Sequence, residues 1–149
     1  MIEILKRAEK ERIEGKIEDF GIKIPGKFQF IKQSKDKIRI FTGNLAARDL
    51  IRLNKILTID TIGLYFAFSK ENDFRLSFDA SILYGKDSKK TIELNSESAK
   101  AWLKGQDLEN ETKKIGYFLI KHNNNILGCG KATKEKILNF VPKERRSNI

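Results

Sequence analysis

Short strand-like segments separated by turn residues fill the second half of the chain, and they restrict its fold more than any other feature. The segments ILTIDTIGLYFAF, NDFRLSFD, TIEL, GYFLIKH, ILGCGKAT and KILNFVP are apolar or alternating, with Gly, Asn, Asp or Ser nearby. One capped helix, SESAKAWLK, interrupts them; Asn95 or Ser96 begins it and Gly105 ends it. Strands at such short intervals predict a compact β-barrel rather than alternating βαβ units.

Residues 1–57 show a different pattern. Apolar residues at helical spacing predict a helix over residues 2–20, which Gly21 ends. KFQFIKQ and KIRIFT predict a β-hairpin, and LAARDLIRL predicts a second helix capped by Asn44. We therefore expect an α+β protein, with a small helix–hairpin–helix domain (residues 1–57) followed by a barrel-like domain (residues 58–149).

The composition indicates a water-soluble chain. No apolar run approaches the roughly 20 residues that span a bilayer, and the N-terminus lacks the apolar core of a secretory signal. A single cysteine, Cys129, excludes an internal disulfide and fits a reducing compartment. We expect a cytoplasmic protein without a membrane partner.

The positive charge is concentrated at the two ends of the chain. Residues 1–64 hold 14 Lys/Arg against 9 Asp/Glu, residues 65–120 hold 9 of each, and residues 121–149 hold 7 against 2, for a net charge of +10. Two positive ends that meet in space would attract a polyanion such as nucleic acid. Lysine enrichment also occurs in heat-adapted proteins, so the charge by itself leaves both readings open.

Motifs for catalysis are missing. GCGKAT differs from a phosphate-binding loop, because Asn125 stands at the early glycine position and Ala132 follows Lys131. His122 is the single histidine, and Cys129 has no accompanying base, so neither a zinc site nor a nucleophilic site is indicated. We expect no enzymatic activity, no cofactor and no metal.

Basic residues follow the last strands and continue into the C-terminus. Lysines and arginines supply phosphate contacts, and the glycines of the strand allow close approach of another backbone. A solvated, frayed terminus would show the same composition. Phe140 is expected in the core. The candidate RNA-binding residues are Lys121, Gly128, Gly130, Lys131, Lys134, Lys136, Asn139, Lys143, Arg145 and Arg146.

The predicted second helix offers a further basic edge. Arg48, Arg52 and Lys55 stand at i, i+4 and i+7, so they line one side of that helix. They extend the candidate RNA-binding path if the two domains pack suitably, and otherwise form an ordinary solvated helix face.

The run GYFLIKHNNNILGCGKATKEKILNFVPKERR resembles the last strands of a PUA-type RNA-binding domain. It is similar in particular to small archaeal ribosome-biogenesis proteins related to the Nol/Nop/Fmu group, whose larger members carry such a tail behind an RNA cytosine-5 methyltransferase domain. Gly-x-Gly-Lys and Asn-aromatic-x-Pro-Lys-x-Arg-Arg carry the resemblance, as do IGLYFAF, FRLSFDAS and IELNSESAKAWLKGQDLE. The resemblance covers residues 58–146 and implies a PUA-like pseudo-barrel, RNA binding and ribosome assembly. The chain shows no S-adenosylmethionine-binding pattern and no Pro-Cys nucleophile motif.

Together these observations predict a non-catalytic protein that binds structured rRNA or tRNA in ribosome biogenesis or RNA maturation. Two alternatives remain: a module that docks on a ribosome-assembly factor or an RNA methyltransferase, and a subunit that presents RNA to a separate catalytic chain.

Overall fold

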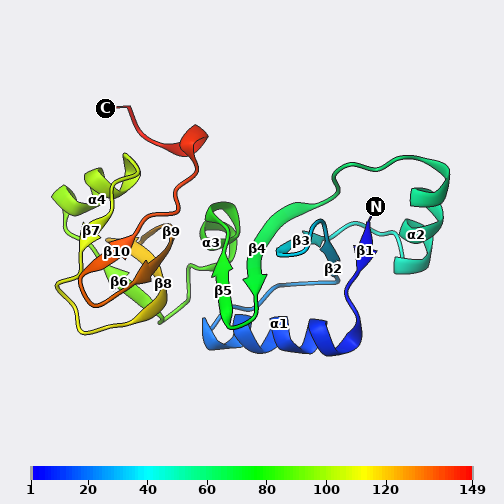
Figure 1. Ribbon diagram of the computed structural model, residues 1–149, viewed down its shortest axis with the longest axis horizontal. Helices are drawn as coiled ribbons and strands as arrows, with labels where there is room; N and C mark the ends of the chain where they lie inside the picture. Colours follow the sequence, from blue (N-terminus) through cyan, green and yellow to red (C-terminus); the bar gives the residue numbers. More distant parts are fainter. Residues whose placement is uncertain (1, 149) are drawn as a thin grey trace.

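Alternating apolar residues in the first half of the chain build a five-stranded antiparallel sheet. The computed structural model describes residues 2–148, and this sheet forms the core of one of its two lobes (Figure 1). Its strands in spatial order are β1 (Glu3–Ile4), β2 (Gln29–Lys32), β3 (Lys37–Phe41), β4 (Leu64–Lys70) and β5 (Asp73–Leu76). The predicted hairpin β2–β3 is present, and the strand-like segments IGLYFAF and NDFRLSFD form a second hairpin, β4–β5.

Helix α1 (Arg7–Asp19) covers this sheet. It buries Ile13 and Ile17, passes through Gly15 without a break, and ends before Gly21, whose φ of +69° suits a residue without Cβ. The predicted start at residue 2 is wrong, because Glu3–Ile4 pairs with β2 as a strand.

Helix α2 (Ala47–Ile56) lies at the far end of this lobe, on the long β3–β4 connection (Figure 1). Its N-cap residue is Ala46 rather than Asn44, and Leu50 is its one fully buried residue.

The second lobe contains a five-stranded mixed sheet and a helix. The strands in spatial order are β6 (Thr91–Glu93), β8 (Gly116–His122), β9 (Asn125–Ala132), β10 (Lys136–Leu138) and β7 (Leu108–Glu109). The pair β6–β8 is parallel and the other pairs are antiparallel.

Helix α4 (Ser96–Leu103) packs on this second sheet. Asn95 caps it as expected, its side-chain oxygen accepting the Ser98 N–H at 2.8 Å. Trp102 is fully buried with Ile120, Ala132 and Ile137, and forms the centre of the second core.

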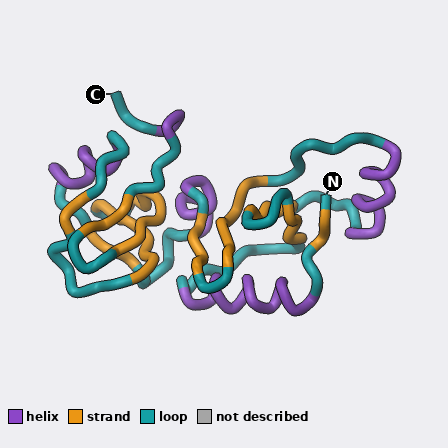
Figure 2. The backbone as a smooth tube through the Cα atoms, in the orientation of Figure 1, coloured by secondary structure: helices purple, strands orange, loops and turns teal. Residues whose placement is uncertain are grey.

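The two sheets meet across helix α3 (Phe78–Tyr84), and Figure 2 shows their strands as separate groups on either side of it. Leu119 and Cys129 from the second sheet join the core of the first lobe. Within residues 2–148, no helix has the length and apolar character needed to cross a membrane.

The first sheet extends further along the chain than the domain boundary predicted at residues 57/58. Strands β4 and β5 hydrogen-bond onto β3, so the sheets divide the chain between Leu76 and Thr91. Long-range pairing, which local composition does not reveal, assigns this hairpin to the first lobe. Whether each part folds as a domain stays a prediction.

Candidate nucleic-acid interface

Three segments that are distant in sequence meet at one end of the second sheet. Because β6 and β8 are parallel, the residues that precede each of them lie at the same end. Gly116, at the start of β8, pairs with Ala132, at the end of β9, so the β9–β10 turn lies there too. Asn110 ties two of these segments together, since its side-chain amide donates to the Lys114 carbonyl (3.0 Å) and the Thr133 carbonyl (2.7 Å).

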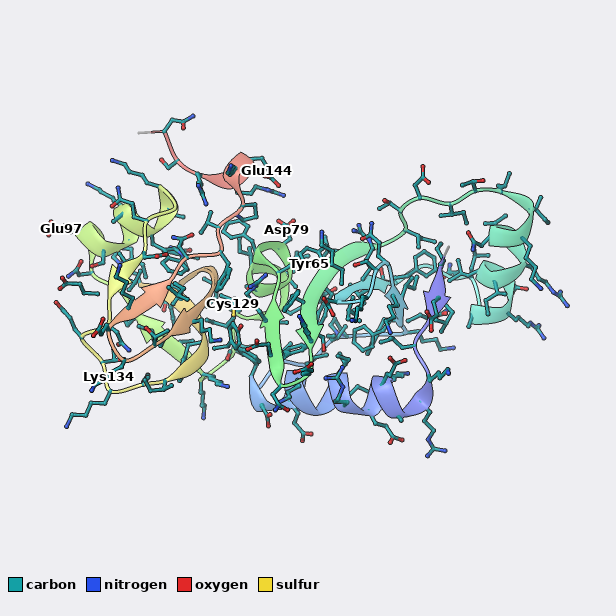
Figure 3. The ribbon with its side chains drawn as sticks, viewed as in Figure 1. Tyr65, Asp79, Glu97, Cys129, Lys134 and Glu144 are labelled. Carbon is teal, nitrogen blue, oxygen red and sulfur yellow. The ribbon has the colours of Figure 1, made fainter. Side chains whose placement is uncertain are left out.

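This end of the sheet is rich in lysine, and we call it the lysine edge. A pair of lysines precedes β6, a second pair precedes β8, and two more flank Glu135, the second of them at the start of β10. The same segments hold four carboxylates, Asp87, Glu109, Glu111 and Glu135, against these six lysines, so positive charge is in excess. In Figure 3, Lys134 marks this edge at the bottom of the second lobe. The lysine edge comprises Lys89, Lys90, Lys113, Lys114, Lys134 and Lys136.

The ammonium groups of the lysine edge differ in how much they are already engaged. Lys114 donates to the Thr91 carbonyl at 2.8 Å, and Lys136 lies opposite Glu109 in the β10–β7 pairing. Lys89, Lys113, Lys134 and Lys136 are exposed, and their side chains have no hydrogen-bond or ion-pair partner among residues 2–148. These four are the cations most available to a ligand.

A half-buried aromatic ring lies beside the lysine edge. Phe118 on β8 has the ammonium groups of Lys90 and Lys114 each 5.5 Å from its ring centroid. Lys90 also lies 4.7 Å from the centroid of Phe20, which ends α1 in the other lobe. Lysines interleaved with a partly exposed ring suit contact with a sugar–phosphate backbone and its bases.

Lys131 fastens the two lobes together. Its ammonium forms an ion pair with Asp73 of β5 at 3.4 Å and lies 5.3 Å from the ring centroid of Tyr117, whose hydroxyl donates to the same carboxylate at 3.2 Å. Interaction with Tyr117 and the hydrogen bond to Asp73 raise the pKa of Lys131. Burial, followed by the charge of Asp73, raises the pKa of Tyr117. Lys131 therefore contributes to the seam between the lobes more than to a free surface.

Gly128 and Gly130 are buried and make room for Trp102. A Cβ on Gly130 would lie 2.8 Å from the indole, and Gly128 has a φ of +110° and lies against Phe78. The Trp102 N–H donates to the Leu127 carbonyl at 2.7 Å, which holds the indole under β9. The two glycines thus shape the strand, and neither presents a surface to RNA.

Residues 139–147, the C-terminal segment, are anchored rather than frayed. The Asn139 amide donates to the carbonyls of Trp102 (2.8 Å) and Gln106 (3.0 Å), and its oxygen accepts the Val141 N–H at 2.8 Å. The Arg146 guanidinium donates to the Val141 carbonyl at 3.1 Å and lies where Gly105 has no side chain. Asn139 and Arg146 therefore hold the segment against α4 and have little freedom to contact RNA.

The remaining cations of the C-terminal half lie away from the lysine edge. Arg145, in the 3₁₀ turn η1 (Lys143–Arg145), forms an ion pair with Asp79 at 2.9 Å. Lys143 is exposed on the same turn, and Figure 3 shows Glu144 of this turn at the opposite end of the lobe from Lys134. Lys121 is half-buried beside Glu93 in the parallel pairing.

The basic side of α2 lies apart from all of these. Arg48, Arg52 and Lys55 are exposed, and Arg48 approaches Asp49 at 3.9 Å. Helix α2 and the second sheet occupy opposite ends of the long axis (Figure 1). The basic side of α2 therefore does not extend the path of the lysine edge.

Sequence reasoning missed Lys89, Lys90, Lys113, Lys114 and Phe118. They belong to residues 65–120, whose net charge is zero because acidic and basic residues are equal in number, so the distribution of charge along the chain did not reveal them. The available signal was the repeated pattern of two lysines directly before a predicted strand, in KKTIEL and KKIGYF. The parallel pairing that joins the two patterns is visible only in the fold.

His122 and Cys129, the two side chains of interest for catalysis, have contacts typical of structural residues. His122 Nδ1 lies 2.8 Å from the Leu94 carbonyl. Burial raises the pKa of Cys129 to about 12, so its thiol stays protonated at neutral pH. Among residues 2–148, no three His, Cys, Asp or Glu side chains gather as a metal site would require.

The β-rich C-terminal part of the chain is similar to a domain of known proteins. Residues 89–147 match the family model described as the methyltransferase RsmF PUA domain. The chain is 27% identical over 89 residues to ribosomal RNA small subunit methyltransferase F of Vibrio vulnificus, covering 59% of this chain and 19% of that protein. It is 26% identical over 129 residues to the Shewanella oneidensis protein of the same name, covering 85% and 26%. The corresponding Aeromonas salmonicida protein is 28% identical over 90 residues, covering 59% and 19%.

The C-terminal part of the chain therefore carries a PUA-like domain, as the sequence resemblance implied. The chain spans only about a fifth to a quarter of the length of these relatives. The lysine edge falls entirely inside the matched segment.

Proposed function

We propose that this protein binds structured ribosomal RNA through the lysine edge and acts in ribosome biogenesis or rRNA maturation without itself catalysing a reaction. The observation that carries the proposal is the gathering of six lysines at one end of a PUA-like sheet by strands that are distant in sequence. The names of the relatives support ribosomal RNA as the class of ligand. The same surface could bind tRNA, and we expect the binding to take place in the cytoplasm.

The chemistry of the lysine edge suits an RNA backbone. Lysine ammonium groups bind phosphates as point charges without reading bases, so they grip RNA by the spacing of its backbone. Double-stranded RNA is recognised mostly by shape and by phosphate and 2′-hydroxyl contacts. A row of lysines on rigid strand ends can supply such contacts, and Phe118 adds a surface on which an unpaired base can stack.

Titration of a labelled RNA hairpin with the protein, at low and at moderate salt, tests the proposal. Phosphate contacts predict an affinity that falls by about 0.7–0.9 logarithmic units per tenfold salt for each phosphate neutralised. Weak binding with little salt dependence would contradict the proposal.

A second candidate function is docking on a separate protein such as an RNA methyltransferase or an assembly factor. Helix α2 is amphipathic, yet its apolar side chains Ile51 (43%) and Ile56 (79%) are exposed, as is Leu57 (55%) just beyond it. Exposed apolar side chains that lie together favour a site for a protein partner. A hollow of about 880 Å³, bordered by Leu45 and Ala46 and by residues of α1, lies next to it. RNA binding that requires an added methyltransferase chain would favour this function.

A further inference from the structure

A small pocket opens where the two lobes meet, on the side away from the lysine edge. It measures about 230 Å³ and is lined by β4, β5, α3, β9 and the C-terminal segment. Figure 3 shows Tyr65 and Asp79 together at this seam, with Glu144 on the turn above them. Sites for drug-sized ligands measure about 300–1,000 Å³, so this pocket suits a smaller molecule. Its polar and aromatic lining includes Tyr65, Arg75, Phe78, Asp79, Phe140 and Glu144.

Arg75 is the unusual member of the lining. Its guanidinium carbon lies 3.8 Å from the ring centroid of Phe140 and 5.1 Å from that of Phe68, so aromatic rings hold it in place. Among residues 2–148 its side chain has no hydrogen-bond or ion-pair partner. Among the described residues, Gln29 Oε1 is the one fully buried side-chain nitrogen or oxygen without a partner. The unpaired nitrogens of Arg75 are therefore not fully buried. Arg75 therefore presents unused donors, in a fixed plane, to whatever enters the pocket.

The charges of the pocket favour a neutral ligand over an anion. Arg145 is paired with Asp79 at 2.9 Å, which leaves Arg75 and Glu144 as the lining charges without partners among the described residues. One guanidinium and one carboxylate cancel, so a phosphate would gain attraction from one and repulsion from the other. A neutral molecule with acceptors on one edge and donors on another would satisfy both groups.

Among RNA bases, guanine fits this requirement best. Its O6 and N7 accept two hydrogen bonds from one arginine, which is the commonest specific contact to that base. Its N1–H and 2-amino group donate side by side, which suits a carboxylate. Adenine offers an amino group without the adjacent ring N–H. Tyr65 and Phe78 provide aromatic surface for stacking, as in sites that take unstacked bases of single-stranded RNA.

We propose that this pocket binds one unpaired guanine base, with Arg75 contacting its O6 and N7 and Glu144 contacting its N1–H and amino group. The inference rests on the proposed RNA-binding function and adds a site at which a single base is read. In such an arrangement the lysine edge grips RNA by shape, and the pocket selects a nucleotide at a bulge, loop or strand end.

Single-stranded oligonucleotides that differ at one base test this site. Uridine-rich strands carrying one guanosine, inosine or adenosine are titrated with the protein by fluorescence anisotropy. We expect the guanosine strand to bind about tenfold more tightly than the adenosine strand. Inosine lacks the 2-amino group, so its strand should bind with intermediate affinity.

Two variants and a matched control assign the preference to the pocket. Glu144→Gln should abolish the difference between guanosine and inosine, whereas Glu97→Gln, which removes an equally exposed carboxylate on α4 (Figure 3), should preserve it. Arg75→Lys keeps the charge but removes the planar fork, and should reduce the guanosine preference about tenfold. Glu144 is exposed on a surface turn, so its variant tests the proposal even if the Arg75 variant folds poorly.

The outcomes separate this inference from the proposed function. Equal affinity for the three strands, with salt-dependent hairpin binding intact, would overturn the guanine pocket and leave the proposed function standing. A guanosine preference that Glu144→Gln leaves unchanged would also overturn it. Failure to bind either hairpin or strand would overturn both.

Discussion

Neutralising three of the free cations of the lysine edge should weaken RNA binding in a way that the fold allows us to quantify. The change is the triple variant Lys89→Gln, Lys113→Gln, Lys134→Gln. These ammonium groups are exposed and without partners among residues 2–148, so each can neutralise one phosphate. The slope of log affinity against log salt should therefore become less steep by about 2.1 to 2.7 units. A fourfold rise in salt should then weaken the wild-type protein about 20- to 40-fold more than the variant.

Fluorescence anisotropy with a labelled RNA hairpin at several salt concentrations measures this slope. The matched control is the triple variant Arg48→Gln, Arg52→Gln, Lys55→Gln, which removes the same charge from α2 at the other end of the molecule. Its slope should equal that of the wild type. Thermal unfolding should be nearly unchanged for both variants, because surface substitutions of this kind usually alter stability by no more than about 0.5 kcal/mol each. A slope lowered by the α2 variant and not by the lysine-edge variant would refute the reasoning.

Three further predictions concern stability, measured by urea unfolding. Gly130→Ala places a methyl group 2.8 Å from Trp102 and should lower the free energy of unfolding by about 1–3 kcal/mol. Gly15→Ala has open space around it in α1 and should raise the free energy of unfolding by up to about 1 kcal/mol. Equal effects of the two variants would contradict the packing described. Asn139→Ala removes the donors and acceptor that anchor the C-terminal segment and should cost about 1–3 kcal/mol, with no change expected for the exposed Asn124→Ala. Burial raises the pKa of Cys129 from 9.0 to about 12, so the stability linked to its proton is complete below pH 9 and is lost as pH rises toward 12. Between about pH 8 and pH 10 the wild type should lose about 1 kcal/mol more than Cys129→Ala, and equal losses would show that the thiol is not buried in its neutral form.

The sequence predicted the local elements well, because their signals are local. Asn95 and Gly105 delimit α4 as expected, and the alternation in KFQFIKQ and KIRIFT gives the β2–β3 hairpin. The start of α1 was wrong because Glu3–Ile4 finds a partner strand about 28 residues away, as β1 pairs with Ile31 and Lys32. Helical spacing cannot show such a partner.

The candidate site was harder to predict, because basic residues can serve the fold as well as a ligand. Asn139 and Arg146 belong to a motif that was correctly singled out, yet both are used to fasten the C-terminal segment to α4. Lys131 binds Asp73 across the seam. Phe140, expected in the core, is half-buried and covers Arg75. These motif residues therefore stabilise the folded C-terminal segment. The sequence alone could not distinguish this structural role from contact with RNA.

The central claim is that RNA lies along the lysine edge of the PUA-like sheet. Photo-crosslinking of a 4-thiouridine-labelled RNA hairpin to the protein, followed by mass spectrometry of the crosslinked peptides, tests it most directly. We predict crosslinks within residues 86–91, 110–118 and 131–137. Crosslinks confined to α2 and the first sheet, with none in these three segments, would contradict the claim.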